Sequence, residues 1–144
     1  VPTTNDGLIG LDDSDASINA DKDGASAYGF KAVNFDFDKN NIRDDQQPVV
    51  AKNVEVAQEV VGQGKTLVVE GHCDQIGSAT YNLALSQRRA ETIKAEMEKS
   101  GIAANEVKTI GYGYERPLVW SDAKERSELI QELAANRRAE ILVN

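Results

Sequence analysis

A short apolar run, Leu67 to Val69, leads into Gly71–Asp74 and is followed at once by a long helical pattern from about Ser78 to Lys99. The run is too short for a helix and rich in β-branched residues, so it predicts a strand that is buried on both faces. A buried strand joined directly to a long helix is typical of a sheet covered by helices. This feature constrains the chain to an α/β arrangement and places Asp74 near the end of a strand.

The remaining patterns after residue 30 are equally regular. Alternating apolar residues predict a strand at 33–37, and apolar spacings of three and four predict a helix that begins after Asp44 or Asp45 and ends at Gly62. Further strands are predicted at 107–111 and 139–143, and the polar stretch 121–133 has helical propensity. The order β-α-β-α-β-(α)-β predicts an α/β (α+β) sandwich with helices packed on a mixed sheet. For the helix at 78–99, the predicted buried stripe is Leu83, Ser86, Ala90, Ile93 and Met97.

Charge and composition exclude several classes of function. The chain has 144 residues, enough for one domain with a core of its own, and a formal net charge of −8. That charge argues against binding to nucleic acid or to anionic membrane surfaces. No apolar run approaches the roughly 20 residues that cross a bilayer, so we expect contact with a membrane only through a part absent from this chain. Cys73 is the single cysteine and cannot form an internal disulfide.

The two ends of the chain differ in composition. Residues 1–28 are rich in Asp, Ser, Gly and Ala and poor in large apolar groups, which predicts an acidic flexible arm. Within it, Asn19–Gly24 has oxygen ligands at alternate positions like the start of a calcium loop, but Phe30 stands where the bidentate Glu is required. A solvated acidic linker is therefore favoured over a calcium site. Residues 29–144 form the predicted folded domain.

Several polar side chains gather where the strand at 67–74 meets the helix at 78–99. His72 and Cys73 point to opposite faces of an extended strand, so they do not form a nucleophile-base pair. Asn82 and Arg89 are seven residues apart and share one helix face. Asp74 is an acceptor-only anion, and Arg89 carries a planar fork suited to a carboxylate. Together they could bind both charges of one zwitterionic ligand, or they could pair with each other or cap the helix.

Six ordered segments of this chain closely resemble the OmpA-like family, which includes the C-terminal domain of outer-membrane protein A, the peptidoglycan-associated lipoprotein and MotB. The resemblance covers residues 30–144 nearly end to end. The segments that carry it are Phe35–Lys39, Val69–Asp74, Gly77-Ser78, Tyr81–Ala90, Gly111–Gly113 and Asn136–Glu140.

This resemblance implies non-covalent binding of peptidoglycan, with no reaction, cofactor or metal, in the periplasm at the outer membrane or cell wall. The implied ligand is the meso-diaminopimelate of the stem peptide, and further envelope proteins are candidate partners. Asp74 would receive the free ammonium of its far stereocentre and Arg89 the free carboxylate. The other implied pocket residues are Asp38, Asn82, Arg137 and the backbone about Cys73. The family usually has Thr in place of Cys73 and often Asn in place of Asp38.

Two other functions remain open from the residues alone. His72 and Asp74, with Asp36 or Asp38 nearby, could hold a divalent metal for hydrolysis, although only one histidine is available. Alternatively, the insert 121–133 or the acidic arm could form a protein-interaction surface, with the neighbouring Trp120 as an interface anchor.

Overall fold

A mixed four-stranded sheet forms the centre of the computed structural model, which describes residues 27–144. The acidic arm predicted at 1–28 therefore lies almost entirely outside the described residues. The strands are β1 (Val33–Asn34), β2 (Leu67–His72), β3 (Val107–Gly111) and β4 (Arg138–Val143), in the order β1-β4-β2-β3. The helices are α2 (Gln47–Gly62), α3 (Ala79–Lys99) and α4 (Arg126–Glu132), with short 3-10 turns at Asp44–Gln46, Ala104–Glu106 and Ala134–Asn136.

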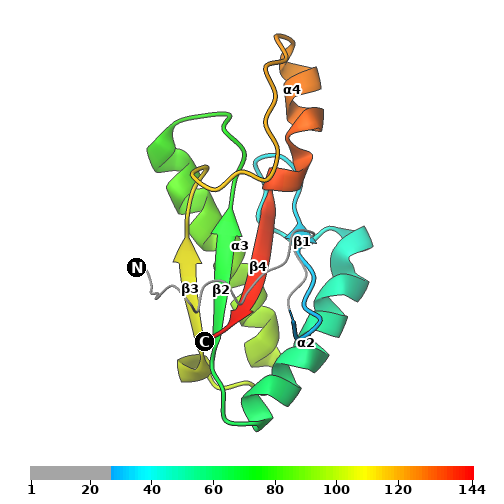
Figure 1. The fold of residues 1–144 in the computed structure, drawn as a ribbon, viewed down its shortest axis with the longest axis vertical. Helices are drawn as coiled ribbons and strands as arrows, with labels where there is room; N and C mark the ends of the chain where they lie inside the picture. The colour runs from blue at the N-terminus through cyan, green and yellow to red at the C-terminus, as the bar shows by residue number, and fades with distance from the viewer. Residues whose placement is uncertain (1–26) are drawn as a thin grey trace.

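The connections explain the mixed sheet. Strands β2 and β3 are parallel and joined through α3, whereas β4 is antiparallel to both β2 and β1. Figure 1 shows α3 running behind β2 and β3, with α2 beside β1. The predicted class, helices packed on a mixed sheet, is confirmed. None of the described helices has both the length and the apolar character needed to cross a membrane.

One face of the sheet carries the apolar core. Leu67 and Val69 of β2 lie beside Ile141 of β4 and Val107 of β3, and all four are buried. Side chains of α2, α3 and the chain around β1 complete the cluster, namely Phe30, Val33, Phe35, Val50, Ala57, Val60, Ile93 and Met97. Strand β2 was predicted to be apolar and buried on both faces. Its second face is buried, but the residues there include the ionisable Glu70 and His72.

Two local predictions need correction. Leu83 is 53% exposed, whereas Asn82 and Leu85 are buried, so the buried stripe of α3 is rotated by about one residue at its first turns. Adjacent helix positions differ by roughly 100°, and the face that packs on the sheet is the one that contains Asn82, Ser86 and Arg89. The predicted strand at 33–37 pairs as a strand only at Val33–Asn34, since the chain turns away at Asp38, where φ is 60°.

The ends of the helices follow local rules only in part. Ser78 caps α3 by accepting a hydrogen bond from the backbone N–H of Tyr81 (3.1 Å). Gly101 has φ of +98°, as predicted for a left-handed residue after the helix. Asp44 and Asp45 instead form a 3-10 turn before α2 with no side-chain cap, and Asp45 pairs with Arg43.

Two glycines allow α3 to lie directly on the sheet. Gly71 and Gly111 are paired neighbours on β2 and β3. A Cβ atom at Gly71 would lie 1.8 Å from the backbone oxygen of Ser86, and one at Gly111 would lie 2.7 Å from the backbone nitrogen of Gln87. Because both obstacles are backbone atoms of α3, the helix itself would have to move. This contact fixes the depth at which α3 meets the end of β2.

We predict that Gly71→Ala lowers the free energy of unfolding by about 3 kcal/mol, because the added methyl group overpacks a rigid backbone contact. Gly62→Ala is the matched control, since a Cβ at Gly62 meets nothing within 4 Å. Urea denaturation of both variants measures the difference. Equal stability of the two variants would show that α3 can shift on the sheet at little cost.

Candidate ligand-binding site

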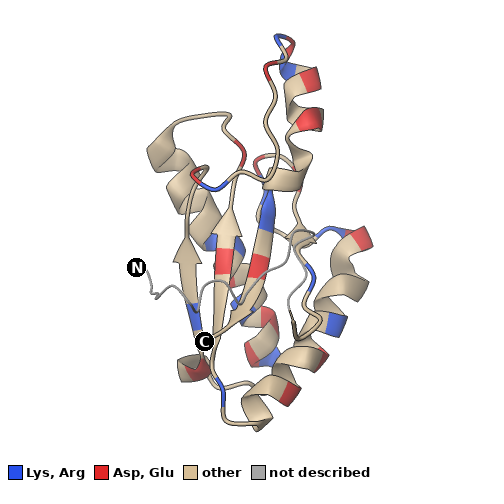
Figure 2. Cartoon of the chain, in the orientation of Figure 1, with Lys and Arg blue, Asp and Glu red and all other residues tan. Residues whose placement is uncertain are grey.

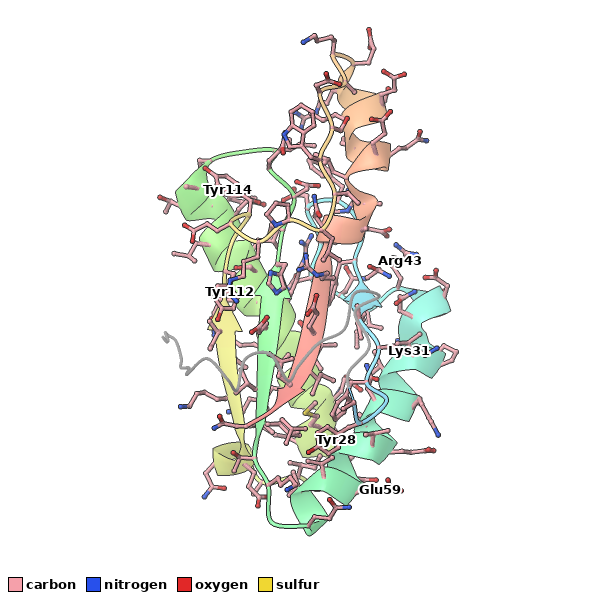
Figure 3. All side chains as sticks on the ribbon, viewed as in Figure 1. Tyr28, Lys31, Arg43, Glu59, Tyr112 and Tyr114 are labelled. Atoms are coloured by element: carbon pink, nitrogen blue, oxygen red, sulfur yellow. The ribbon has the colours of Figure 1, made fainter. Side chains whose placement is uncertain are left out.

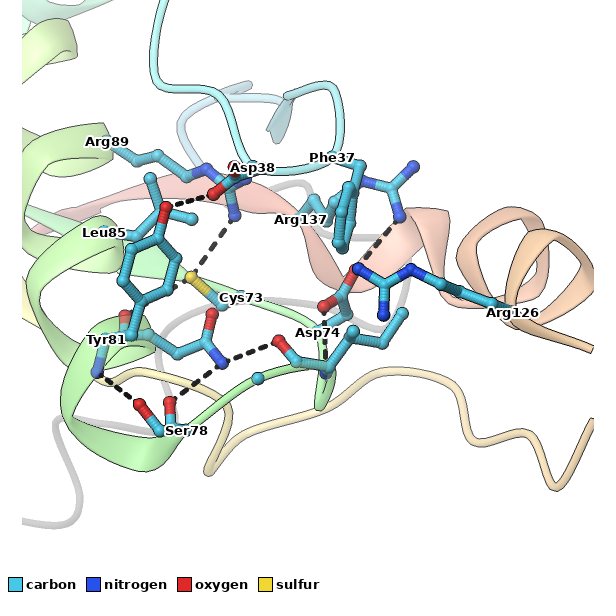
Figure 4. Close-up of a pocket in the computed structure, with 13 residues that line it drawn as sticks. Phe37, Asp38, Cys73, Asp74, Ser78, Tyr81, Leu85, Arg89, Arg126 and Arg137 are labelled. Carbon is cyan, nitrogen blue, oxygen red and sulfur yellow. Dashed lines mark hydrogen bonds and ion pairs between the residues drawn. The ribbon is translucent and has the colours of Figure 1, made fainter. Parts of the chain in front are cut away.

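A pocket of about 420 Å³ opens beyond the carboxyl end of β2. It lies between the loop after β1, the β2–α3 loop with the first turns of α3, and α4 (Figure 4). All six site residues suggested by the sequence line this one pocket. They are Asp38, Cys73, Asp74, Asn82, Arg89 and Arg137, and the other lining residues are Phe37, Ile76, Gly77, Ser78, Tyr81, Leu85 and Arg126.

Asp74 is 3% exposed and is held from two sides. Its Oδ2 accepts a hydrogen bond from Nη1 of Arg137 (3.1 Å), and its Oδ1 accepts one from the backbone N–H of Ile76 (3.1 Å). Arg137 is itself positioned by the backbone carbonyls of Phe35 and Ile130. The cationic partner of Asp74 is thus Arg137. The alternative in which Asp74 pairs with Arg89 is not what the structure contains.

Arg89 is 1% exposed and has only uncharged acceptors. Nε donates to the carbonyl of Lys39 (2.8 Å), Nη1 to that of His72 (2.9 Å) and Nη2 to that of Asp36 (3.1 Å). Nη1 also makes a weaker contact with Sγ of Cys73 (3.4 Å). Arg89 forms no ion pair with any residue in the described part of the chain, and burial lowers the pKa of its guanidinium. The pocket therefore contains a buried guanidinium that is not paired directly with a carboxylate of any described residue.

Asp38 and Tyr81 form the wall of the pocket nearest the loop after β1. The Tyr81 hydroxyl donates a hydrogen bond to Oδ1 of Asp38, and this bond raises the pKa of the tyrosine. Asp38 has no ion pair with any described residue. Unlike Asp74, it is therefore an anion in the pocket that lacks a basic partner.

Asn82 and Cys73 have mainly positioning contacts. The Asn82 amide donates to the carbonyls of Ile76 (2.9 Å) and Ser78 (3.1 Å) and so closes the β2–α3 loop. The backbone N–H of Cys73 donates to the carbonyl of Gly113 (2.8 Å). That N–H is consequently not free for the ligand contact that the family resemblance implied for the backbone about Cys73.

We predict that the Cys73 thiol is almost unreactive in the folded protein. The residue is 2% exposed, and burial raises the pKa of the thiol to about 11, so about one thiol in a thousand is ionised at pH 8. Alkylation by iodoacetamide, followed by mass spectrometry, should be far slower in buffer than in 8 M urea. Similar rates in the two solvents would mean that the β2–α3 loop opens readily.

His72 belongs to a separate buried cluster on the other face of the sheet. Its Nε2 lies 3.2 Å from Oε1 of Glu70, and ligand-type atoms of Glu70, His72 and Glu140 all lie within 4.8 Å of one another. Figure 2 shows the acidic bands of β2 and β4 side by side in the middle of the sheet. Nε of Arg138 donates to Glu140 (2.5 Å), so a guanidinium already supplies the positive charge that a metal would bring.

The metal-hydrolase alternative required His72 and Asp74 to share one site, and the structure separates them. Strand β2 ends at His72, so the two-residue alternation that would place both side chains on one face does not continue to Asp74. The His72 ring stacks on Tyr112 at 5.4 Å, beyond the end of β3 (Figure 3). Among the described residues, the only group of three metal-type ligands is the one that contains Glu70, and it excludes Asp74.

We predict that His72 makes the folded state sensitive to mild acid. Burial lowers the pKa of His72 below its ordinary value of about 6.5, so the unfolded chain takes up a proton that the folded chain does not. The stability that neutral, buried His72 contributes to the folded state is fully present above about pH 6.5. It is lost as the pH falls from there towards the pKa of His72 in the folded state. Between pH 7 and pH 5.5 the wild type should lose about 1 kcal/mol more unfolding free energy than His72→Gln in urea titrations. Parallel losses would contradict this.

Some pocket residues escaped the sequence analysis. Tyr81 directly precedes Asn82 and could have been found from the helix geometry. Arg126 carried no such signal, because it lies in the insert, far along the chain from the other pocket residues. The position of α4 brings it to Phe37, where its guanidinium carbon lies 5.4 Å from the ring centroid.

Comparison with known proteins identifies relatives over most of the chain. Residues 34–131 match the model of the OmpA family. A peptidoglycan-associated lipoprotein of Brucella melitensis is 34% identical over 119 residues, which are 83% of this chain and 69% of that protein. The crystal structure of the peptidoglycan-associated lipoprotein from Burkholderia pseudomallei has a TM-score of 0.66 and 26% identity, and the match covers 78% of this chain and 89% of that one. The C-terminal domain of Helicobacter pylori MotB has a TM-score of 0.63 at 17% identity, covering 81% and 86%, a likeness of fold alone.

Proposed function

This chain belongs to the OmpA family, and from that premise we propose that it binds peptidoglycan non-covalently through the diaminopimelate of the stem peptide. Such binding would anchor the outer membrane or an envelope complex to the cell wall from the periplasmic side. The names of the peptidoglycan-associated lipoproteins support the polymer as the ligand. The choice of diaminopimelate rests on the chemistry of the pocket.

The observation that carries this proposal is the buried Arg89 without an anionic partner. A buried guanidinium that bonds only to neutral carbonyls is costly, and a carboxylate ligand would offset that cost. Four of its five N–H groups donate to a described residue, one of them in the weak contact with the sulfur of Cys73. The second N–H of Nη2 donates to no described residue, and the N–H of Nη1 that points at the Cys73 sulfur is only weakly bound. These two N–H groups can donate to the two oxygens of a ligand carboxylate.

An ammonium group would be bound by the two carboxylates of the pocket, those of Asp74 and Asp38. Each oxygen of Asp74 accepts one hydrogen bond and retains a lone pair for a further donor. Because Arg137 already neutralises Asp74, the unpaired Asp38 supplies the additional negative charge that an ammonium needs. A zwitterionic amino-acid centre placed between Arg89 and these two carboxylates satisfies all three groups.

Affinity for the wall would then depend on many weak contacts. One small pocket gives modest binding to a single stem peptide, whereas the polymer offers the same epitope many times. No chemical step is part of this proposal, because the pocket holds no assembled pair of nucleophile and base. Binding of envelope proteins through the insert 121–133 would be compatible with it.

The proposal predicts that a soluble muropeptide with diaminopimelate binds roughly 10- to 100-fold more tightly than its lysine counterpart, which lacks the carboxylate for Arg89. Arg89→Lys keeps the charge but loses the planar fork, and it should weaken diaminopimelate binding by a similar factor. Isothermal titration calorimetry measures both effects.

Arg88→Lys is the matched control, because Arg88 is the exposed neighbour of Arg89 and does not line the pocket. Circular dichroism must show that Arg89→Lys remains folded, and Asp74→Asn tests the ammonium side independently. Equal affinity for the two muropeptides, or wild-type affinity in both folded variants, would rule out the proposal.

A further inference from the structure

The charges that line the pocket exceed what one zwitterionic centre can use. Three guanidinium groups, those of Arg89, Arg126 and Arg137, face two carboxylates, those of Asp38 and Asp74. Arg137 is paired with Asp74, and Arg89 is assigned to the diaminopimelate carboxylate. The far stereocentre of diaminopimelate has no net charge. After it binds, the pocket keeps one positive charge, and that charge belongs to Arg126.

Arg126 is accessible and has donors to spare. The residue is exposed, and it forms no hydrogen bond or ion pair through its guanidinium with any residue in the described range 27–144. Its guanidinium carbon lies 5.4 Å from the centroid of the Phe37 ring, which lines the same pocket. Figure 4 shows the side chain extending from α4 towards Phe37 and Asp74. A cation–π contact of this kind orients the guanidinium without using its N–H groups.

The fold also fixes the backbone from which Arg126 extends. Nη1 of Arg137 donates to the carbonyl of Ile130 in α4 (2.8 Å), so the residue that holds Asp74 also holds the helix. Ser121 Oγ donates to Glu132 (2.5 Å) and ties the segment before α4 to the end of that helix. Arg126 therefore extends from the first turn of a helix whose later turns are held at Ile130 and Glu132.

From this arrangement we propose that Arg126 is a specificity residue that binds a second carboxylate of the stem peptide, next to the diaminopimelate centre held by Arg89 and Asp74. The inference rests on the proposed function and deepens it by naming the substrate class. The pocket would prefer stem peptides in which that carboxylate is free over those in which it is amidated. Two carboxylates of a stem peptide have the required chemistry, the α-carboxylate of its γ-linked glutamate and the carboxylate at its C-terminus.

The test compares three diaminopimelate muropeptides by isothermal titration calorimetry. One has both carboxylates free, one is amidated at the glutamyl α-carboxylate, and one is amidated at the C-terminus. Wild type should bind one of the amidated peptides roughly 3- to 10-fold more weakly than the free form. The peptide that loses affinity identifies which carboxylate Arg126 binds. Arg126→Gln should bind all three equally. Its contact is near the surface, so the preference should shrink in 0.5 M salt.

Lys124→Gln is the matched control, since it removes one positive charge from the same insert at a residue that does not line the pocket. This variant should keep the wild-type preference. Equal wild-type affinity for all three peptides, or an undiminished preference in Arg126→Gln, would overturn the role of Arg126. Either result would leave the proposed function intact as long as diaminopimelate is still preferred over lysine. Failure of wild type to bind any of the three would instead reject the proposed function.

Discussion

The backbone contact between Gly71 and Ser86 sets the geometry of the whole binding region. With no side chain on β2 at that position, α3 lies against the strand itself, and Gly111 extends the same contact to β3. The next turn of α3 then places Arg89 beneath the end of β2, within hydrogen-bond reach of the carbonyl of His72. The close packing that the two glycines allow therefore positions the buried guanidinium of Arg89 at the base of the pocket.

The treatment of buried charge differs between the two faces of the sheet. On one face, Glu70, His72, Arg138 and Glu140 form a buried cluster in which Arg138 pairs with Glu140 and His72 contacts Glu70. At the pocket, Asp74 is offset by Arg137, but Arg89, Arg126 and Asp38 have no ionic partner among the described residues. Burial of Arg89 without a paired carboxylate is costly unless a ligand supplies one, and the exposed Asp38 and Arg126 add charges of both signs that a ligand can use at the same pocket. This is the physical basis for assigning a zwitterionic and acidic ligand.

Much of this architecture was predictable from local pattern. The glycine-flanked strand, the long helix with its serine cap and the glycine after it were each specified by neighbouring residues. Asp74, Asn82 and Arg89 could be grouped from the strand end and the helix that follows it, whereas Asp38, Cys73 and Arg137 were named through the family resemblance; all six line one pocket. The errors had two causes. The buried face of α3 was placed about one residue out of register, so Leu83 was assigned to the core, and strand alternation was carried past the end of β2, so His72 was grouped with Asp74.

The amino-acid sequence alone was sufficient to predict the order of the helices and strands, because that order depends on short-range periodicity and on turn chemistry. It also showed which charged residues lie near the end of β2. The pairing of those charges was not accessible at that level. Whether Asp74 is neutralised by Arg89 or by Arg137, and whether Arg126 reaches the pocket at all, depends on contacts between segments far apart in the sequence, such as the 63 residues between Asp74 and Arg137. Electrostatic partners are selected by distance and burial in three dimensions, and no local pattern encodes either quantity.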